Sequence, residues 1–346
     1  MFSKNIQREE EIAFHFGKLL AEDSDLKWRL LASSEPDCDA VAELEINGKT
    51  WRFAVKYELL PTVASLRDFS AQKGSLPLLL VTPELSARII ALCKQEDIAA
   101  IDLNGRVWLR ASGLLVDRQA LPGRRFRYAF EPGNIFTGKS VRIVRSLLAD
   151  RTRVWTQTEL AARTQTSGAL VSRISRYLIR QGFVERTSAR QLRVCDYLGL
   201  VDAWARADRL AKRVHTVRYA GFIGQPQELA HKLQDWAREH SVSVAFTQWL
   251  AAWCRVPYAD VLIAAAYVSR LPSTAELEAL GLYPVDDGGQ LWLHVPDDEG
   301  LFLETQVQKD LTLTTDAQIY VDLQQSPLRG PDQARALRDW ENFCKS

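Results

Sequence analysis

Apolar residues recur with strand-like and helical periods along the chain, and changes in this pattern divide it into three blocks. In the first block, residues 1–120, the two patterns follow one another, with helices predicted near 9–22, 61–73 and 84–95 and strands near 26–32, 40–46, 51–57, 76–81, 99–103 and 107–111. The Asn47-Gly48 dipeptide between two alternating segments predicts a tight hairpin turn. Strands interleaved with helices predict an α/β domain.

The third block, residues 197–346, returns to α/β character. Helices are predicted near 198–213, 227–239, 246–254 and 332–344, and strands near 261–268, 290–295 and 318–323. Between the first and second blocks lies a stretch with proline and glycine, residues 121–138, which predicts a linker. Its Arg124, Arg125 and Arg127 either extend toward a polyanion or are simply solvated. The fold expected for the whole chain is therefore multidomain α/β.

The second block, residues 139–196, predicts three helices followed by a hairpin. The predicted order is a helix at residues 140–149, a short strand, a helix at 159–163, a turn at 164–166, a helix at 168–181 and a hairpin at 183–195. Thr156 and Glu159 have the spacing of a capping box at the second helix. Ser167 and Gly182 suit the start and the end of the third helix. This order is that of a winged helix-turn-helix.

The third helix of this block has an apolar face and an opposite, cationic face. At 100° per residue, Leu170, Val171, Ile174 and Leu178 fall on one side, and three arginines fall on the other. Such a helix can enter the major groove of DNA, with arginines at guanine edges or phosphates and the hairpin as a wing. The predicted DNA-binding residues are Thr166, Ser167, Ser172, Arg173, Arg176, Arg180, Arg186 and Arg190. The alternative is a winged helix that makes only protein contacts.

The charge distribution supports a polyanionic partner for the second block. Between residues 139 and 195 there are twelve basic and three acidic residues, a formal charge of +9 in a chain whose net charge is +1. The remainder therefore carries −8. Such asymmetry is typical of a nucleic-acid-binding segment, although a basic surface can also be merely solvated.

Several classes of protein and of site are excluded by the sequence. No apolar run reaches the ~18 residues of a membrane span, and the charged N-terminus is unlike a secretory signal. Five scattered cysteines, none in a CxxC pair, predict neither disulfides nor a metal site, and they suggest a cytoplasmic location. The absence of phosphate-binding glycine motifs predicts no cofactor. Asp286-Asp287 precedes Gly-Gly and predicts a hairpin turn rather than a catalytic pair.

The chain resembles the AbiEi-type antitoxins and transcriptional regulators of type IV toxin–antitoxin, or abortive-infection, systems, in the longer branch with an extra N-terminal domain. The resemblance is carried by FAVKYELLPTVASL, by LPLLLVTPELSARIIALCKQEDIAAIDLNGRVWL, by VWTQTELAARTQTSGALVSRISRYLIRQGFV and by DAQIYVDLQQSPLRGPDQA, at residues 53–66, 76–109, 154–184 and 316–334. It implies a regulator that binds its own promoter and antagonises a nucleotidyltransferase-like toxin. The helix-turn-helix is central here, whereas shorter members have it at the N-terminus.

The first block also resembles the PD-(D/E)xK nuclease fold. That chemistry needs an acid on one strand and an acid-x-Lys triplet on the next, so that carboxylates hold Mg²⁺ while the lysine orients water. Asp37 or Asp39 and Lys56 match two positions, but Ala54 stands where the second carboxylate is needed. We therefore expect an inactive scaffold with a degenerate site at Asp39, Ala54 and Lys56. The metal site could be restored only if Glu58 or Glu43 supplied the missing carboxylate.

The sequence thus predicts a non-enzymatic regulator with three domains, at residues 1–120, 139–196 and 197–346, joined by the linker at 121–138. Its predicted activity is sequence-specific binding of double-stranded DNA, with repression of transcription, as a homodimer on a symmetric operator. Two alternatives stay open. One is a Mg²⁺-dependent nuclease brought to DNA by the winged helix, and the other is an antitoxin that acts by contact with its toxin.

Overall fold

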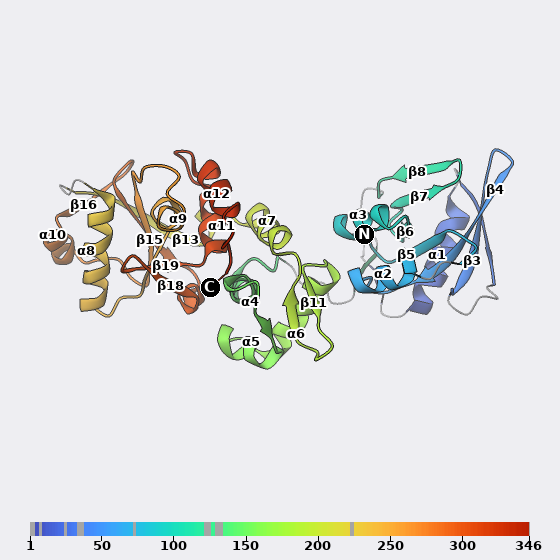
Figure 1. Ribbon diagram of the computed structural model, residues 1–346, viewed down its shortest axis with the longest axis horizontal. Helices are drawn as coiled ribbons and strands as arrows, with labels where there is room; N and C mark the ends of the chain where they lie inside the picture. Colours follow the sequence, from blue (N-terminus) through green and yellow to red (C-terminus); the bar gives the residue numbers. More distant parts are fainter. Residues whose placement is uncertain are drawn as a thin grey trace. The chain divides into compact units, whose positions relative to one another are not determined.

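The computed structural model describes residues 4–6, 9–23, 26–32, 38–71, 74–120, 126–128, 134–221 and 225–345. The protein has a mixed α/β fold, and its contacts group the chain into two compact units (Figure 1). The N-terminal unit comprises Met1–Pro132 with Arg176–Gly182, and the C-terminal unit comprises Gly133–Ser175 with Phe183–Ser346.

The N-terminal unit contains a seven-stranded sheet whose strands follow one another in chain order, β2 to β8. The pairs β4–β5 and β5–β6 are parallel and the other neighbouring pairs are antiparallel. The strands are β2 (Lys27–Leu31), β3 (Ala40–Ile46), β4 (Lys49–Tyr57), β5 (Leu78–Thr82), β6 (Ala99–Asp102), β7 (Val107–Ala111) and β8 (Leu114–Arg118). A separate short parallel pair joins β1 (Lys4–Ile6) to β9 (Phe126–Tyr128).

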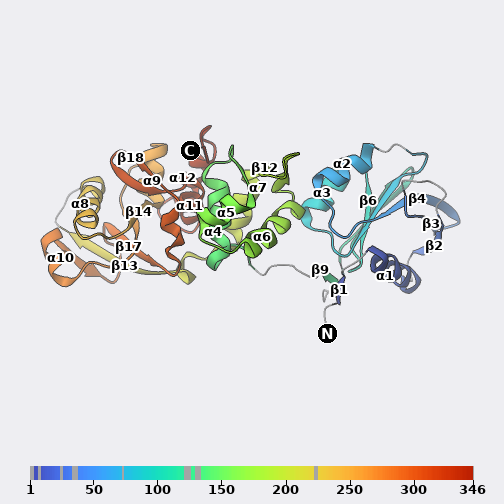
Figure 2. The same ribbon diagram turned by 90° about the horizontal axis from the view of Figure 1, so that it is seen from below.

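Helices cover both faces of this sheet (Figure 2). One core is shared by α1 (Glu9–Glu22) and the sheet face that carries Phe53 and Val55. The other core lies beneath α2 (Val63–Ala71) and α3 (Ala87–Gln95). Two apolar faces explain why β5 and β6 are buried almost throughout, as parallel strands covered on both sides must be.

The predicted Asn47-Gly48 turn is present between β3 and β4. Asn47 and Gly48 have φ angles of 50° and 75°, and the residues on either side, Ile46 and Lys49, are paired. A two-residue loop with both central residues at positive φ matches the twist of the strands that it joins. The turn thereby fixes the register that places Ala40 opposite Val55.

A segment of three helices and a small sheet, residues 134–196, is called here the central segment. Most of it belongs to the C-terminal unit, and its residues Arg176–Gly182 are grouped with the N-terminal unit. The sheet is antiparallel, in the order β10-β12-β11. The elements are α4 (Gly138–Ala149), β10 (Val154–Trp155), α5 (Gln157–Thr164), α6 (Gly168–Arg180), β11 (Val184–Arg186) and β12 (Leu192–Val194). The three helices and the hairpin that the sequence predicts are therefore present.

The rest of the C-terminal unit is built on a second seven-stranded sheet, in the order β16-β13-β17-β15-β14-β19-β18. Its strands are β13 (Val214–Gly221), β14 (Val244–Thr247), β15 (Ala264–Val268), β16 (Leu282–Val285), β17 (Leu291–Pro296), β18 (Thr305–Gln308) and β19 (Leu311–Thr314). Its helices are α7 (Tyr197–Ala207), α8 (Pro226–Glu239), α9 (Gln248–Arg255), α10 (Thr274–Leu280), α11 (Asp316–Leu323) and α12 (Gly330–Arg338), with short 3₁₀ turns η1 (Leu210–Lys212) and η2 (Glu299–Leu303).

Three local predictions for this unit are wrong. Residues 318–323, expected as a strand, belong to helix α11, which packs against α4, α7, α9, α12 and β14. A helix covered on all sides has no polar face, so periodicity cannot distinguish it from a buried strand. Phe246 and Thr247 end strand β14 instead of starting a helix. Asp286-Asp287 is not in a hairpin, because β13 lies between β16 and β17 in the sheet.

Candidate functional site

Helix α5 is fixed at both ends by local hydrogen bonds. The hydroxyl of Thr156 accepts a hydrogen bond from the Glu159 amide at 3.2 Å, and the Thr156 amide donates to Glu159 Oε2 at 2.9 Å. This confirms the predicted capping box, which satisfies two amides that the helix itself leaves open. Gln165 ends the helix with a left-handed φ of 52°, and the chain turns directly into α6.

Helix α6 has the amphipathic form that its sequence predicts over most of its length. Val171, Ile174 and Leu178 are fully buried, whereas Arg173 and Arg176 on the other side are exposed. The predicted exposure of Arg180 is wrong, because that residue is only 6% exposed and its guanidinium lies 5.2 Å from the Tyr177 ring centre. Arg180 lies on the same helical face as Arg173, so periodicity alone could not separate them.

The start of α6 carries the three predicted hydroxyl residues in different surroundings. Ser167 is exposed, and its Oγ accepts a hydrogen bond from the Leu170 amide at 3.2 Å, as a capping residue does. The Thr166 hydroxyl lies 2.8 Å from the hydroxyl of Thr164. Ser172 is half-buried one turn further along. Of the three, Ser167 is the most accessible to a ligand at this end of the helix.

The hairpin β11–β12 presents cations on its outer side. Val184, Leu192 and Val194 are buried, while Arg186 and Arg190 are exposed, as the alternation predicts. The tip is tight, since the Arg190 amide donates to the Thr187 carbonyl at 2.9 Å and Arg190 has a φ of 60°. Arg193, in contrast, forms an ion pair with Glu185 across the hairpin.

Two arginines of the central segment are paired with carboxylates elsewhere in the C-terminal unit. Arg142 on α4 forms an ion pair with Asp298, and Arg163 on α5 forms one with Glu304. Arg173, Arg186 and Arg190, by comparison, have no carboxylate partner among the described residues. The arginines of the segment thus differ in their surroundings: Arg142 and Arg163 have acidic partners, whereas the other three are exposed and have none in the described part of the chain. Sequence reasoning missed these partners because they are more than 140 residues away.

The degenerate nuclease positions lie together in the N-terminal unit. Lys56 Nζ is 3.4 Å from Asp39 Oδ1, and Asp39 Oδ2 accepts a hydrogen bond from the Tyr57 amide at 2.7 Å. Ala54 is buried between β3 and β5, where it supplies no ligand. Asp37 lies outside the described residues. Among the described residues, no three acidic, histidine or cysteine side chains are placed to hold a metal ion.

The two glutamates that could replace the missing carboxylate, Glu43 and Glu58, have different surroundings. Glu43 is bound by Arg52, whose Nη2 lies 2.7 Å from Glu43 Oε1. Burial raises the pKa of Glu58, which a hydrogen bond from Ser65 partly offsets. At the described motif positions, Asp39 supplies a carboxylate and residue 54, an alanine, does not.

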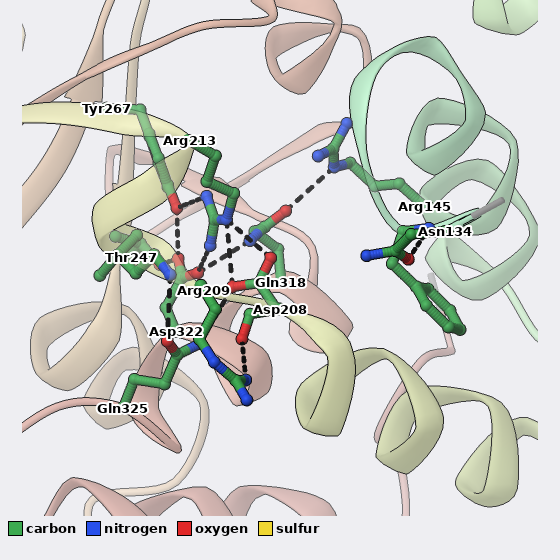
Figure 3. A network of polar contacts seen from close by, with 12 residues as sticks. Asn134, Arg145, Asp208, Arg209, Arg213, Thr247, Tyr267, Gln318, Asp322 and Gln325 are labelled. Carbon is green, nitrogen blue, oxygen red and sulfur yellow. Dashed lines mark hydrogen bonds and ion pairs between the residues drawn. The ribbon is translucent and has the colours of Figure 1, made fainter.

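A buried polar network that the sequence did not predict lies in the C-terminal unit (Figure 3). Its centre is Asp322 on α11, which is fully buried and accepts hydrogen bonds from Thr247 at 2.5 Å and from Tyr267 and Gln318 at 2.8 Å each. Arg213 donates to the same carboxylate and also to Asp208. Burial and the adjoining Asp322 raise the pKa of Tyr267 well above its usual value. The network therefore holds a neutral Tyr267 between charged partners.

No helix in the described part of the chain is both long enough and apolar enough to span a membrane. No protein-family model matches the chain, and neither the curated proteins nor the solved structures contain a significant match to it. Its function is therefore inferred from its own geometry and charge.

Proposed function

We propose that the chain is a sequence-specific, double-stranded-DNA-binding regulator of transcription. In this proposal the central segment is a winged helix, α6 is its recognition helix and the β11–β12 hairpin is its wing. One observation carries the proposal: Arg173 and Arg176 are exposed on the side of α6 opposite its buried face, with Arg186 and Arg190 exposed on the hairpin that follows.

The chemistry of these groups matches that of a DNA surface. Arginine donates two parallel hydrogen bonds to guanine O6 and N7 in the major groove, and it also binds phosphate oxygens. Arg173 lies in the second turn of α6, the part of a recognition helix that reaches base edges. Arg190 lies at the tip of a tight hairpin, where it is suited to a backbone phosphate. Arg176 on α6 and Arg186 on the hairpin are further exposed cations.

The proposal includes repression by a homodimer. A single winged helix contacts a short site, and a two-fold pair of subunits on two half-sites gives longer and more selective recognition. A repressor of this kind would bind upstream of its own gene and exclude the polymerase. The nuclease alternative is not proposed, since Ala54 replaces a needed ligand. The antitoxin role stays a prediction of the family resemblance.

The test is an anisotropy titration of a labelled duplex that carries the DNA upstream of the gene. The double variant Arg173→Ala/Arg176→Ala should lose about 2–5 kcal/mol of binding free energy, at roughly 1–3 kcal/mol for each base contact. The matched control, Lys232→Ala/Arg238→Ala, removes two exposed cations from α8 and should bind as the wild type does. Equal binding by the folded α6 variant and by the control would refute the proposal.

A further inference from the structure

A cavity of about 380 Å³ lies within the C-terminal unit. It lies between α4 of the central segment and the part that contains the second seven-stranded sheet, residues 197–345, called here the sheet domain. Its volume is in the range of small-molecule sites in proteins. The wall on one side is the first half of α4 with the residues just before it, and on the other side it is η1 with the loop after β17. The charged side chains on its lining are Arg145, Asp208, Arg209, Lys212, Arg213, Asp297 and Asp298.

Arg145 is the unusual member of this lining. It is only 4% exposed, and its guanidinium donates to Gln318 Oε1 at 3.1 Å (Figure 3). The guanidinium also donates to the Gly300 carbonyl at 3.3 Å. No carboxylate among the described residues forms a hydrogen bond or an ion pair with it. Burial, with some contribution from nearby Arg213, lowers the pKa of Arg145 to about 10, so it remains charged at neutral pH. A buried charge without a counter-ion is costly, and natural proteins usually pair it.

The carboxylates close to the cavity are already engaged by other groups. Asp298 binds Arg142, and Asp208 binds Arg213 and also accepts a hydrogen bond from Gln325 at 3.0 Å. Asp298 and Asp322 stabilise Arg145 only from a distance, and Asp322 is itself bound by Arg213. Asp297 is exposed. Neither engaged carboxylate on the lining is therefore available to Arg145.

Two further cations face the cavity from η1 and its edge. Arg209 and Lys212 are both exposed, and neither forms an ion pair with a carboxylate in the described part of the chain. The Arg209 guanidinium donates only to the carbonyls of Arg206 and Asp208, at 3.0 and 2.6 Å. With Arg145 they give three cations without carboxylate partners, against the single exposed carboxylate of Asp297.

The N-terminus of α4 adds a fourth favourable group. Thr137 precedes the helix but does not cap it, because its hydroxyl donates to the Asn134 carbonyl at 3.0 Å instead. Asn134, Thr137 and Gly138 all line the cavity. The positive end of a twelve-residue helix is thereby directed at the same space as the three cations.

We infer that this cavity is a binding site for a small anionic metabolite that carries a carboxylate or phosphate group. The anion would act as the counter-ion of Arg145 and would be held at the opening by Arg209 and Lys212. Because α4 supplies one wall and the sheet domain the other, the bound anion would join the two parts of the C-terminal unit. This site does not depend on the proposed DNA binding, since its ligand is measured on the protein alone.

The test is calorimetry with two probes, inorganic phosphate and citrate, on the full chain at constant ionic strength set with chloride. We expect saturable binding of at least one probe, which identifies the phosphate or the carboxylate class. The variant Arg209→Ala/Lys212→Ala should bind that probe at least tenfold more weakly. The control Lys232→Ala/Arg238→Ala removes the same charge from α8 and should bind it with unchanged affinity. No saturable binding of either probe, or equal loss in both variants, would overturn the inference.

A second variant examines the buried guanidinium itself. Arg145→Gln should remove the response to the probe without lowering the melting temperature of the free protein by more than a few degrees, because it removes an uncompensated charge. A folded Arg145→Gln protein that binds the probe with wild-type affinity would contradict the assigned role. The comparison of Arg209→Ala/Lys212→Ala with its control decides the inference even if Arg145→Gln does not fold.

Discussion

Arg163 on α5 and Glu304 after η2 form a two-point ion pair, with Nε–Oε1 and Nη2–Oε2 distances of 2.8 Å each. The Ser146 hydroxyl donates to the same carboxylate at 2.6 Å, and Glu304 is only 7% exposed. One acidic residue of the sheet domain thus binds α4 and α5 together. Part of the positive charge of the central segment is therefore structural and is not available to a ligand.

Removal of this charge should destabilise the C-terminal unit. Glu304→Gln keeps the size of the side chain but loses its charge, so Arg163 and Ser146 keep a weaker partner. We expect the free energy of unfolding to fall by about 1.5–3 kcal/mol, the range for hydrogen bonds to charged groups. Urea denaturation measures the change. Glu299→Gln, an exposed neighbour on η2, is the control, and an equal effect of both substitutions would contradict the prediction.

Asp322 should be the most sensitive position of the buried network. Asp322→Asn leaves Arg213 without one of its two carboxylates in a buried environment, which typically costs about 3–5 kcal/mol. Tyr267→Phe removes a hydroxyl that donates to Asp322 and accepts from Arg213, but it keeps the ion pair, so it should cost about 1.5–3 kcal/mol, the range for a hydrogen bond to a charged group. Thermal and urea unfolding of both variants distinguish the two values. A smaller effect for Asp322→Asn than for Tyr267→Phe would refute this ranking.

His294 should make the stability depend on pH below neutrality. Burial lowers the pKa of His294 to about 3, whereas an unfolded histidine titrates near pH 6.5. The unfolded chain therefore binds a proton that the folded chain rejects, and stability falls as pH drops below about 6.5 toward 3. Between pH 7.5 and 5.5 this one group should cost about 1.4 kcal/mol.

The variant His294→Asn isolates this contribution. It removes the titrating group, so the pH dependence of its unfolding free energy should be flatter than that of the wild type by this amount. His215→Asn, an exposed position on the neighbouring strand β13, should leave the pH dependence almost unchanged. A His294 NMR resonance that titrates near pH 6.5 in the folded protein would disprove the lowered pKa.

The two hairpin arginines should differ in their effect on DNA binding. Arg190 is exposed at the tip, whereas Arg193 is held by Glu185. If Arg190 neutralises one phosphate, Arg190→Ala should reduce the slope of log K against log salt concentration by about 0.9, and Arg193→Ala should reduce it less. Anisotropy titrations at salt concentrations from about 50 to about 200 mM measure the slope for each variant. Equal slopes for the two variants would count against the hairpin as a phosphate contact.

Features set by neighbouring residues could be predicted from the sequence. The capping box at Thr156 and Glu159 and the turn at Asn47 and Gly48 depend on two to four consecutive residues, and both are present. The buried face of α6 follows from a repeat of 3.6 residues, which places Val171 and Ile174 together. The exposure of Arg173 and Arg176 follows from the same repeat, so most of the candidate DNA surface could be predicted.

Features set by distant parts of the chain were decided only by the tertiary structure. Arg180 lies on the same face of α6 as Arg173 but is buried. Periodicity predicts the face on which a residue lies, but it does not predict which other residues cover that face. Helix α11 has a strand-like sequence because elements on every side exclude water from it. Arg142 and Arg145 lie one turn apart on α4, but only Arg142 has a carboxylate partner. That carboxylate belongs to a segment more than 150 residues away in the sequence. Local patterns determine which elements form; long-range packing and charge pairing determine which side chains remain available to a ligand.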